Sequence, residues 1–249
     1  MRVVLIVFGI VISLAGRSQE ILKHGDVSTW FMTQTQLNFN PKWQLGLELH
    51  ERMSGTFQPQ SQFLIRPYVS YRAGTTSFFF GYTNLNLAKN DLYGQPIRKF
   101  ENNIWEQVLL RFDAGKFRLQ NRFRQEHRWS EKIVTANGSS AIDGVAYSNR
   151  FRLQFVAEHD LIHFKNDRKL FGLFMDELWV NQNAQLLPTG YARNWLFLGV
   201  GYAINKHQNV QLRFLHQYDK VGTTSTYIST PIIQGFYLLD MHLKDKKKS

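Results

Sequence analysis

Polar and apolar residues alternate at every second position along most of the chain. Between Phe117 and Trp129 the even-numbered residues are all polar or charged, whereas the odd-numbered residues are mostly apolar. The segment from Trp43 to Met53 repeats this pattern, with leucines on one face and charged residues on the other. A period of two is typical of β-strands, whose successive side chains point to opposite faces of a sheet. The pattern therefore predicts an all-β protein.

The alternation divides the chain into eleven strand-like segments, most of them about 11–13 residues long. This length exceeds the ~5–6 residues of ordinary globular strands and matches the ~9–11 tilted residues that cross a bilayer. The predicted strands span residues 27–39, 43–53, 61–71, 76–87, 103–113, 117–129, 146–163, 169–181, 193–204, 209–219 and 230–243.

The connections between these segments alternate between short and long. Short turns are predicted at 40–42, 72–75, 114–116, 165–168 and 205–208, and longer polar loops at 54–60, 88–102, 130–145, 182–192 and 220–229. Short turns at one end and long loops at the other are the layout of an outer-membrane barrel. We therefore predict an antiparallel transmembrane β-barrel of ten to twelve strands, with short periplasmic turns and longer extracellular loops. Bacterial single-chain barrels have an even number of strands, so a count of eleven would leave the first strand starting on the unexpected side.

The first 18 residues have the features of a secretory signal peptide. An apolar run from Val3 to Ala15 follows a basic start, and Gly16 and Ser18 are the small residues expected before a cleavage site. We predict cleavage after Ser18, with cleavage after Ala15 as the alternative. The rest of the chain contains no apolar run long enough to span a membrane as a helix, so a membrane protein would have to be a barrel. Residues 19–249 are thus predicted to form one barrel domain in the bacterial outer membrane.

Charged residues mostly occupy the polar phase of their strands, which we expect to face the lumen. An Arg or Lys on the lipid face would cost about 2–4 kcal/mol at mid-membrane. Glu48, His50, Arg52 and Arg213 belong to this phase. The predicted luminal charge cluster consists of Arg66, Arg111, Arg118, Arg122, Arg124, Glu126, Arg128, Arg150, Arg152, Glu158 and Glu177.

The luminal cluster admits two interpretations. An Arg–Glu ladder could fill a small barrel and satisfy its own charges, or the excess arginine could form a small passive channel that prefers anions. Eight strands are just filled by side chains and sixteen to eighteen leave an aqueous channel, so ten to twelve strands leave both interpretations open. The chain has 30 Lys and Arg against 19 Asp and Glu, a net charge of +11.

The tryptophans offer a separate prediction. All of them lie within three residues of a predicted strand end, and indole settles at the membrane–water interface because it has an apolar body and a polar N–H. The predicted interface aromatics are Trp30, Trp43, Trp105, Trp129, Trp179 and Trp195.

Several short motifs occur in the order found in a known family. They are Trp105-Glu106-Gln107, the alternating arginines from Arg122 to Arg128, and Asn149-Arg150-x-Arg152, followed by Glu177-x-Trp179-x-Asn181 and Leu198-Gly199-Val200-Gly201-Tyr202. Over roughly residues 27–243 the chain resembles the Bacteroidota outer-membrane β-barrel family catalogued as domain of unknown function 2490. The resemblance implies a barrel fold and an outer-membrane location. It implies no catalytic residues, because the activity of the family is unassigned.

Few residues suggest enzymatic chemistry. The chain has no cysteine, which excludes thiol catalysis and Cys-liganded metals. His159 and His163 are spaced as in a helical zinc motif, but on a strand residues four apart lie ~13 Å apart and cannot share a metal ion. No histidine is followed two positions later by serine, the pair found in acyl hydrolases of the outer membrane; a cross-strand pair such as His127 with Ser130, or with a loop serine such as Ser139, remains open.

The functional prediction is therefore a structural barrel or a small anion-preferring channel, with a lipid-modifying acyl hydrolase as the alternative. We predict no enzyme activity and no cofactor. The expected partners are outer-membrane lipid and lipopolysaccharide, the barrel assembly machinery and a small anionic solute; no nucleic-acid-binding motif is present.

Overall fold

The computed structural model describes residues 21–23, 27–55, 60–90, 94–136, 138–220 and 227–243. The predicted signal peptide, residues 1–18, lies outside these ranges. The strands are β1 (Ile21–Lys23), β2 (Ser28–Asn38), β3 (Trp43–Met53), β4 (Gln60–Ala73), β5 (Thr76–Asn90), β6 (Pro96–Ala114), β7 (Phe117–Ala136), β8 (Ser139–His163), β9 (Lys169–Gln182), β10 (Pro188–Asn205), β11 (Gln208–Lys220) and β12 (Tyr227–His242).

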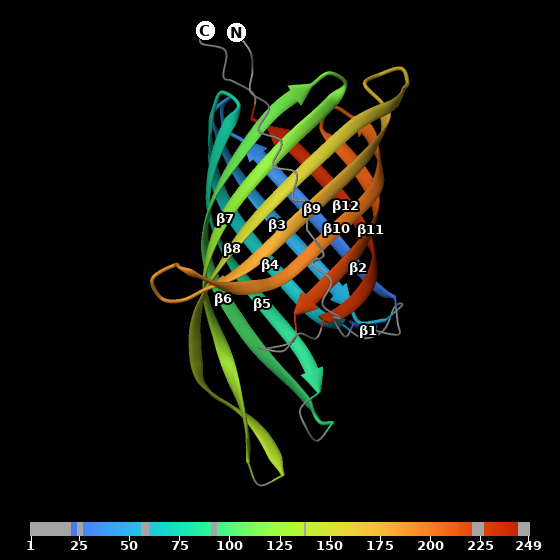
Figure 1. Cartoon of the computed structure of the whole chain (residues 1–249). Coiled ribbons are helices and arrows are strands. Elements are labelled where there is room, and N and C mark those ends of the chain that lie inside the picture. Colours follow the sequence, from blue (N-terminus) through green and yellow to red (C-terminus); the bar gives the residue numbers. More distant parts are fainter. Residues whose placement is uncertain are drawn as a thin grey trace.

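These strands form one sheet that closes on itself as a tilted barrel (Figure 1). From β2 to β12 each strand pairs antiparallel with the next, and β12 then pairs with β2. The closing pair is parallel and runs from Ser28 opposite Ile232 to Asn38 opposite His242. In the described part of the chain the closed ring therefore has eleven strands, which confirms the all-β barrel and the predicted strand count.

The parallel closing pair explains why an odd number of strands is tolerated. In a meander each strand reverses direction, so the first and the eleventh run the same way and can only pair in parallel. β2 consequently starts at the end of the barrel that carries the long loops. The short strand β1 also pairs in parallel with β12. It contacts the first residues of β12, from Tyr227 to Ser229, whereas β2 pairs with the later residues from Ile232 onward.

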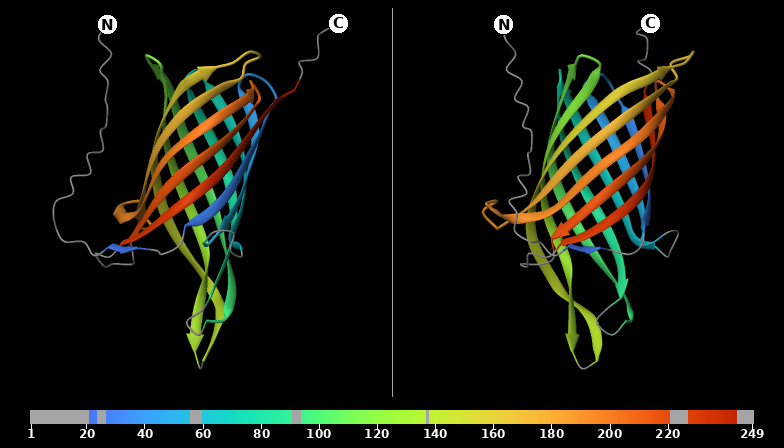
Figure 2. Two further views of the ribbon diagram at one scale, coloured as in Figure 1. Left: turned by 90° about the vertical axis from the view of Figure 1, so that its right-hand side faces the viewer. Right: turned by 45° about the vertical axis from the view of Figure 1, so that its right-hand side comes forward.

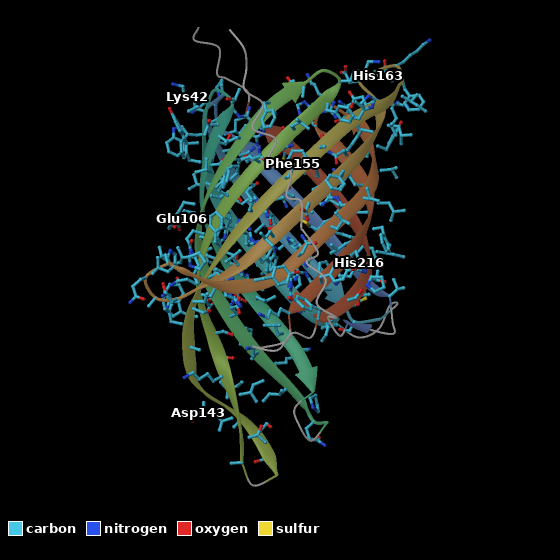
Figure 3. All side chains as sticks on the ribbon, viewed as in Figure 1. Lys42, Glu106, Asp143, Phe155, His163 and His216 are labelled. Atoms are coloured by element: carbon cyan, nitrogen blue, oxygen red, sulfur yellow. The ribbon has the colours of Figure 1, made fainter. Side chains whose placement is uncertain are left out.

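The two ends of the barrel differ, as the loop lengths predict. The short turns gather at the upper end in Figure 3, where Lys42 and His163, the last residue of β8, are labelled. The long connections lie at the opposite end, where β7 and β8 continue past the barrel wall as a paired arm; Figure 2 shows the arm from two further sides. Among the described residues no helix is long and apolar enough to cross a membrane.

Two of the predicted loops are largely paired strand in the structure. The sequence pattern predicts a loop over residues 130–145, but β7 and β8 stay paired from Glu131 opposite Val145 to Ala136 opposite Ser139. Much of the predicted loop 88–102 likewise belongs to β5 and β6, which pair as far as Asn90 opposite Pro96. The polar composition of these segments favours loops, but each segment continues a pair of barrel strands, so its cross-strand contacts extend a ladder that is already formed.

Successive residues on one strand face opposite environments. On β11, Phe214 is 49% exposed on the outer face, whereas its neighbour Leu215 is fully buried in the interior. Bulky inward side chains fit because glycines face them across the sheet. A Cβ atom at Gly46 would lie 2.0 Å from the ring of Tyr68, and one at Gly81 would lie 2.3 Å from the ring of Trp105.

Candidate functional site

The interior of the barrel holds a cavity of about 1040 Å³. Its lining residues come from both ends of the barrel, from Gln62 and Lys99 beside the long loops to Lys206 and His207 in a short turn. The structure places every residue of the predicted luminal charge cluster in this interior. The cavity is lined by Arg66, Arg111, Arg118, Arg122, Arg124, Arg128, Arg150, Arg152, Glu158 and Glu177, and Glu126 is buried among the arginines.

Glu126 and Glu177 are the centre of a buried ion-pair network, and each is only 1% exposed. Arg150 donates to Glu126 through Nε at 2.7 Å, and Arg152 donates to the other carboxylate oxygen at 2.8 Å. Arg152 also donates through Nε to Glu177 at 2.6 Å, which is the carboxylate that Arg122 contacts as well. These residues lie on the neighbouring strands β7, β8 and β9. The register of the two strand pairs places residues 126, 152 and 177 on the same face of the sheet, close enough to contact one another.

A second buried network lies on β3, β4, β5 and β6. Arg66 donates to Glu48 at 2.7 Å and to the hydroxyl of Thr83 at 3.0 Å. Thr83 also accepts a hydrogen bond from the indole of Trp105, at 3.0 Å. His50 lies 3.4 Å from the same Glu48 carboxylate. Buried charges are tolerated when they are paired and hydrogen-bonded, so these contacts let the charged wall fold.

The tryptophan prediction is wrong for four of the six residues. Trp30, Trp105, Trp179 and Trp195 are 7%, 1%, 4% and 6% exposed and point into the lumen rather than to the outer face. Only Trp43 and Trp129 are substantially exposed, at 47% and 38%. The predicted interface belt is therefore not supported for the four buried residues.

Arginines cover the rings of the buried tryptophans. The guanidinium of Arg124 lies 4.2 Å from the ring centre of Trp105, and that of Arg152 lies 4.0 Å from that of Trp179. A desolvated guanidinium over an indole face contributes about 2 kcal/mol. Strand phase could have revealed that Trp105 faces inward, since it alternates in step with the inward Gln107.

Arginines outnumber carboxylates in the central and long-loop parts of the lumen. Among the described residues, nine arginines face five acids there. The arginines are Arg52, Arg66, Arg122, Arg124, Arg128, Arg150, Arg152, Arg193 and Arg213, and the acids are Glu48, Glu101, Glu126, Glu177 and Asp219. The excess positive charge makes this part of the cavity favourable for anions.

The end of the lumen near the short turns has a more even balance of acidic and basic side chains. Arg118 lies 2.8 Å from Asp160 and 3.4 Å from Glu158, and Lys169 lies 3.0 Å from Asp160. Acids and bases are thus interleaved at this mouth. Positive charge is concentrated toward the long loops.

The structure shows what surrounds the histidines that the sequence singled out. Among the described residues no three His, Asp or Glu side chains are close enough to hold a metal ion. His127 contacts Tyr147 and Asn149 at 2.9 Å, so it does not form the suggested pair with Ser130, whose hydroxyl accepts from Lys99.

A different histidine does contact a serine. Nε2 of His216 lies 2.8 Å from the hydroxyl of Ser229 across β11 and β12. Both residues alternate out of phase with the luminal residues of their strands, which places them on the outer face. His216 lies in the long-loop half of the barrel in Figure 3.

A comparison with protein families assigns the chain to a family. The model of the family described as Protein of unknown function (DUF2490) matches residues 27–227. The chain belongs to this family. The predicted resemblance is therefore confirmed, while an origin in Bacteroidota stays a prediction. No curated protein matches the chain.

One solved structure is similar in fold to this DUF2490 member. It is the crystal structure of the beta domain of the Bordetella autotransporter Brka, with a TM-score of 0.46 and 13% sequence identity. The match covers 79% of this chain and 81% of that chain.

The luminal prediction missed some residues of the DUF2490 barrel that complete its networks. Glu101 receives two hydrogen bonds from Arg128, at 2.9 and 2.6 Å, and Arg193 pairs with Asp219. The missed residues Glu101, Arg193 and Asp219 lie inside a predicted loop or at the ends of predicted strands. Extending the alternation outward from Asn103 to Glu101 would have placed Glu101 in the lumen.

Proposed function

We propose that the protein is an integral barrel of the bacterial outer membrane whose arginine-rich lumen admits small anions. The single observation that supports this most strongly is the excess of buried arginine around the cavity, described above. We place the short turns on the periplasmic side of the membrane, and the long loops and the β7–β8 arm on the extracellular side. Lipid and lipopolysaccharide would surround the outer face, and the barrel assembly machinery would insert it.

The outer face supports a lipid environment. Large apolar side chains are exposed there along every long strand, whereas a soluble monomer rarely exposes contiguous apolar patches beyond a few hundred Å². Among them Leu198 is 58% exposed, Leu212 is 59% exposed and Phe80 is 58% exposed. Placed in hydrocarbon, these side chains satisfy the same hydrophobic preference that would make the free surface aggregate in water.

A charge on the outer face tests the membrane part of the proposal. We expect Leu212→Arg to lower the free energy of unfolding in lipid vesicles by about 2–4 kcal/mol, because it places a guanidinium in hydrocarbon. Ile142→Arg is the matched control: Ile142 is exposed on the arm beyond the barrel wall, and the change should leave stability within about 0.5 kcal/mol. Equal, small effects of both variants would contradict a membrane-embedded outer face.

Ion selectivity tests the anion part. Purified protein in a planar bilayer should give a small conductance whose reversal potential in a salt gradient indicates anion preference. Arg213→Gln and Arg124→Gln should each shift the reversal potential toward zero, since each removes positive charge from the lumen. Cation preference, or an absence of conductance across all conditions, would contradict passage of anions.

The pair of His216 and Ser229 keeps an acyl hydrolase as a second candidate. A serine hydroxyl within hydrogen-bond distance of an imidazole is the arrangement that activates a nucleophile. In the part of the chain that the structure describes, no carboxylate hydrogen-bonds to His216 to orient it, and Ser229 is only 9% exposed. For these reasons we rank this candidate second.

A fluorophosphonate probe tests the hydrolase candidate directly. Labelling of wild-type protein that disappears in Ser229→Ala, together with release of fatty acid from phospholipid vesicles, would establish the hydrolase. Labelling that persists in Ser229→Ala, or none at all, would remove it.

A further inference from the structure

Arg52 is a buried luminal arginine whose described neighbours include no acidic partner. It is 7% exposed, lies next to the long-loop end of β3 and lines the cavity. Its guanidinium stacks 4.2 Å from the ring centre of Trp30, and Nη1 donates to Gln62 at 2.9 Å. Its Nε is buried and has no hydrogen-bond partner among the described residues. No carboxylate of those residues lies within ion-pair distance of it.

The groups around Arg52 are themselves positive. The guanidiniums of Arg52, Arg152 and Arg193 lie 5.5, 5.7 and 5.7 Å from the ring centre of Trp195. Arg150 joins them on the neighbouring ring of Trp179, at 4.2 Å. Four guanidiniums are thus gathered around two adjacent indoles.

The carboxylates near this group bind the other three guanidiniums and leave Arg52 without an acidic partner among the described residues. Glu126 binds Arg150 and Arg152, and Asp219 binds Arg193. The charge of Arg52 is therefore not neutralised by side chains of the described residues. Like charges at close range repel each other in a low-dielectric interior, so an anion between them would relieve the repulsion.

We propose that Arg52, Arg150 and Arg193 form a binding site for a small oxyanion of the phosphate type at the long-loop end of the cavity. The site rests on the proposed anion-admitting lumen and gives it a specific capture point. All three side chains line the cavity, and those of Arg150 and Arg193 retain 14% and 28% exposure. Planar guanidiniums match the tetrahedral oxygens of phosphate because they donate parallel hydrogen bonds.

The surroundings favour a free solute over a lipid headgroup. The three arginines face the cavity, whereas lipid would contact the opposite, apolar face of the same strands. The indole rings of Trp30 and Trp195 cover the guanidinium of Arg52, which shields the site from bulk water and strengthens its hydrogen bonds.

Titration of the full mature chain in detergent micelles with inorganic phosphate tests the site. Calorimetry measures the binding, and tryptophan fluorescence reports it locally, because Trp30 and Trp195 contact Arg52. We expect saturable binding at one site. Arg52→Gln should weaken it about ten-fold, which corresponds to about 1.4 kcal/mol. Arg52→Lys, which keeps the charge but loses the planar donors, should give an intermediate affinity and serves if Arg52→Gln fails to fold.

Two further variants make the test specific. Arg168→Gln removes the same charge from an exposed short turn and should bind phosphate as the wild type does. Arg213→Gln removes a luminal charge that contacts Gln211, Gln234 and Phe236 instead of the indoles. If Arg213→Gln weakens phosphate binding as much as Arg52→Gln does, the binding depends on the overall positive charge of the lumen, and the proposed site is overturned.

Other outcomes are equally decisive. Absence of saturable phosphate binding, or unchanged affinity in Arg52→Gln, overturns the site even if the bilayers conduct anions. Phosphate binding in a protein that does not conduct leaves the site standing and contradicts only passage through the barrel. Displacement of phosphate by micellar phosphatidylglycerol would identify a lipid headgroup and overturn the assignment to a free solute.

Discussion

Two ion pairs of the same chemistry lie at different depths of the barrel. Arg152 and Glu126 are 2.8 Å apart in the packed half toward the long loops, and their side chains are 4% and 2% exposed. Arg118 and Glu158 are 3.4 Å apart near the short turns, and their side chains are 36% and 23% exposed. Neighbouring strands contribute both pairs, since β7 and β8 pair through both positions.

The difference shows that the charged luminal face of the sheet is packed like a protein core in one half of the barrel and is hydrated in the other. In the packed half, arginine, glutamate and tryptophan replace the apolar core of a soluble protein, and removing one partner leaves an uncompensated charge in the interior. In the half near the short turns the same residue types stay hydrated, and solvent screens them. Charge that remains unpaired in the packed half is therefore the charge best placed to act on a solute.

The largest expected effect is that of Glu126→Gln. The substitution keeps the shape but leaves Arg150 and Arg152 without their shared carboxylate, so we expect a loss of about 3–5 kcal/mol in the free energy of unfolding. Urea unfolding monitored by the gel shift of the unheated barrel measures it. A gain in stability would mean that position 126 faces lipid, and the assignment of the two faces would be reversed.

A steric substitution in the same half should have the next largest effect. A Cβ atom at Gly81 would lie 2.3 Å from the ring of Trp105 and 2.9 Å from the carbonyl oxygen of Pro67. Gly81→Ala should therefore destabilise the barrel by about 1–3 kcal/mol through overpacking. The shift of the urea midpoint measures the loss.

Gly172 provides the matched control for this steric prediction. A Cβ atom there would meet the side chain of Leu161 at an ordinary 3.7 Å, so Gly172→Ala should change the urea midpoint little. Equal effects of the two glycine substitutions would show that backbone propensity, rather than the indole of Trp105, determines the cost.

The stacking of arginine on Trp179 should contribute a smaller amount. The guanidiniums of Arg150, Arg152 and Arg193 lie 4.2, 4.0 and 4.8 Å from its ring centre. We expect Trp179→Leu to be less stable than Trp179→Phe by about 1 kcal/mol, because only phenylalanine retains an aromatic face. If leucine and phenylalanine are equally tolerated in denaturant titrations, the rings act through volume alone.

The smallest effect is expected for Glu158→Gln near the short turns. Its pair with Arg118 is partly hydrated, and Arg118 keeps Asp160 as a second partner, so the loss should be only about 0.2–1 kcal/mol. Repeating the unfolding at about 1 M salt should remove most of this difference. A cost comparable to that of Glu126→Gln would erase the distinction between the two halves.

Much of the architecture could be predicted from local pattern. The predicted strand 43–53 has the bounds of β3, and the predicted short turns lie where the chain reverses. The alternation of polar and apolar residues predicts the strands because each residue faces either the lumen or the outer surface, and these two environments favour different side chains. It fails for the β7–β8 arm, where no barrel wall distinguishes the two faces and none of the described residues 131–136 and 138–145 is buried.

The candidate site was predictable as a set of residues but not as a set of contacts. The phase of Arg150, Arg152 and Glu177 places them inside the lumen, whereas their shared hydrogen bonds depend on register between strands about 25 residues apart in sequence. The interface prediction for Trp179 rests on its position near a strand end and leaves its phase aside. The inward phase that it shares with Glu177 decides its location.

By itself, the sequence determined an all-β barrel with a charged inner face and an apolar outer face, because a period of two is a property of each strand alone. Only the tertiary structure decided that β12 closes in parallel on β2, bringing Asn38 within 2.5 Å of Asp240. It alone decided which of the described arginines are paired and which, like Arg52, are left without a carboxylate. Pairing is a property of the closed ring, since each guanidinium competes for the carboxylates that neighbouring strands bring within reach.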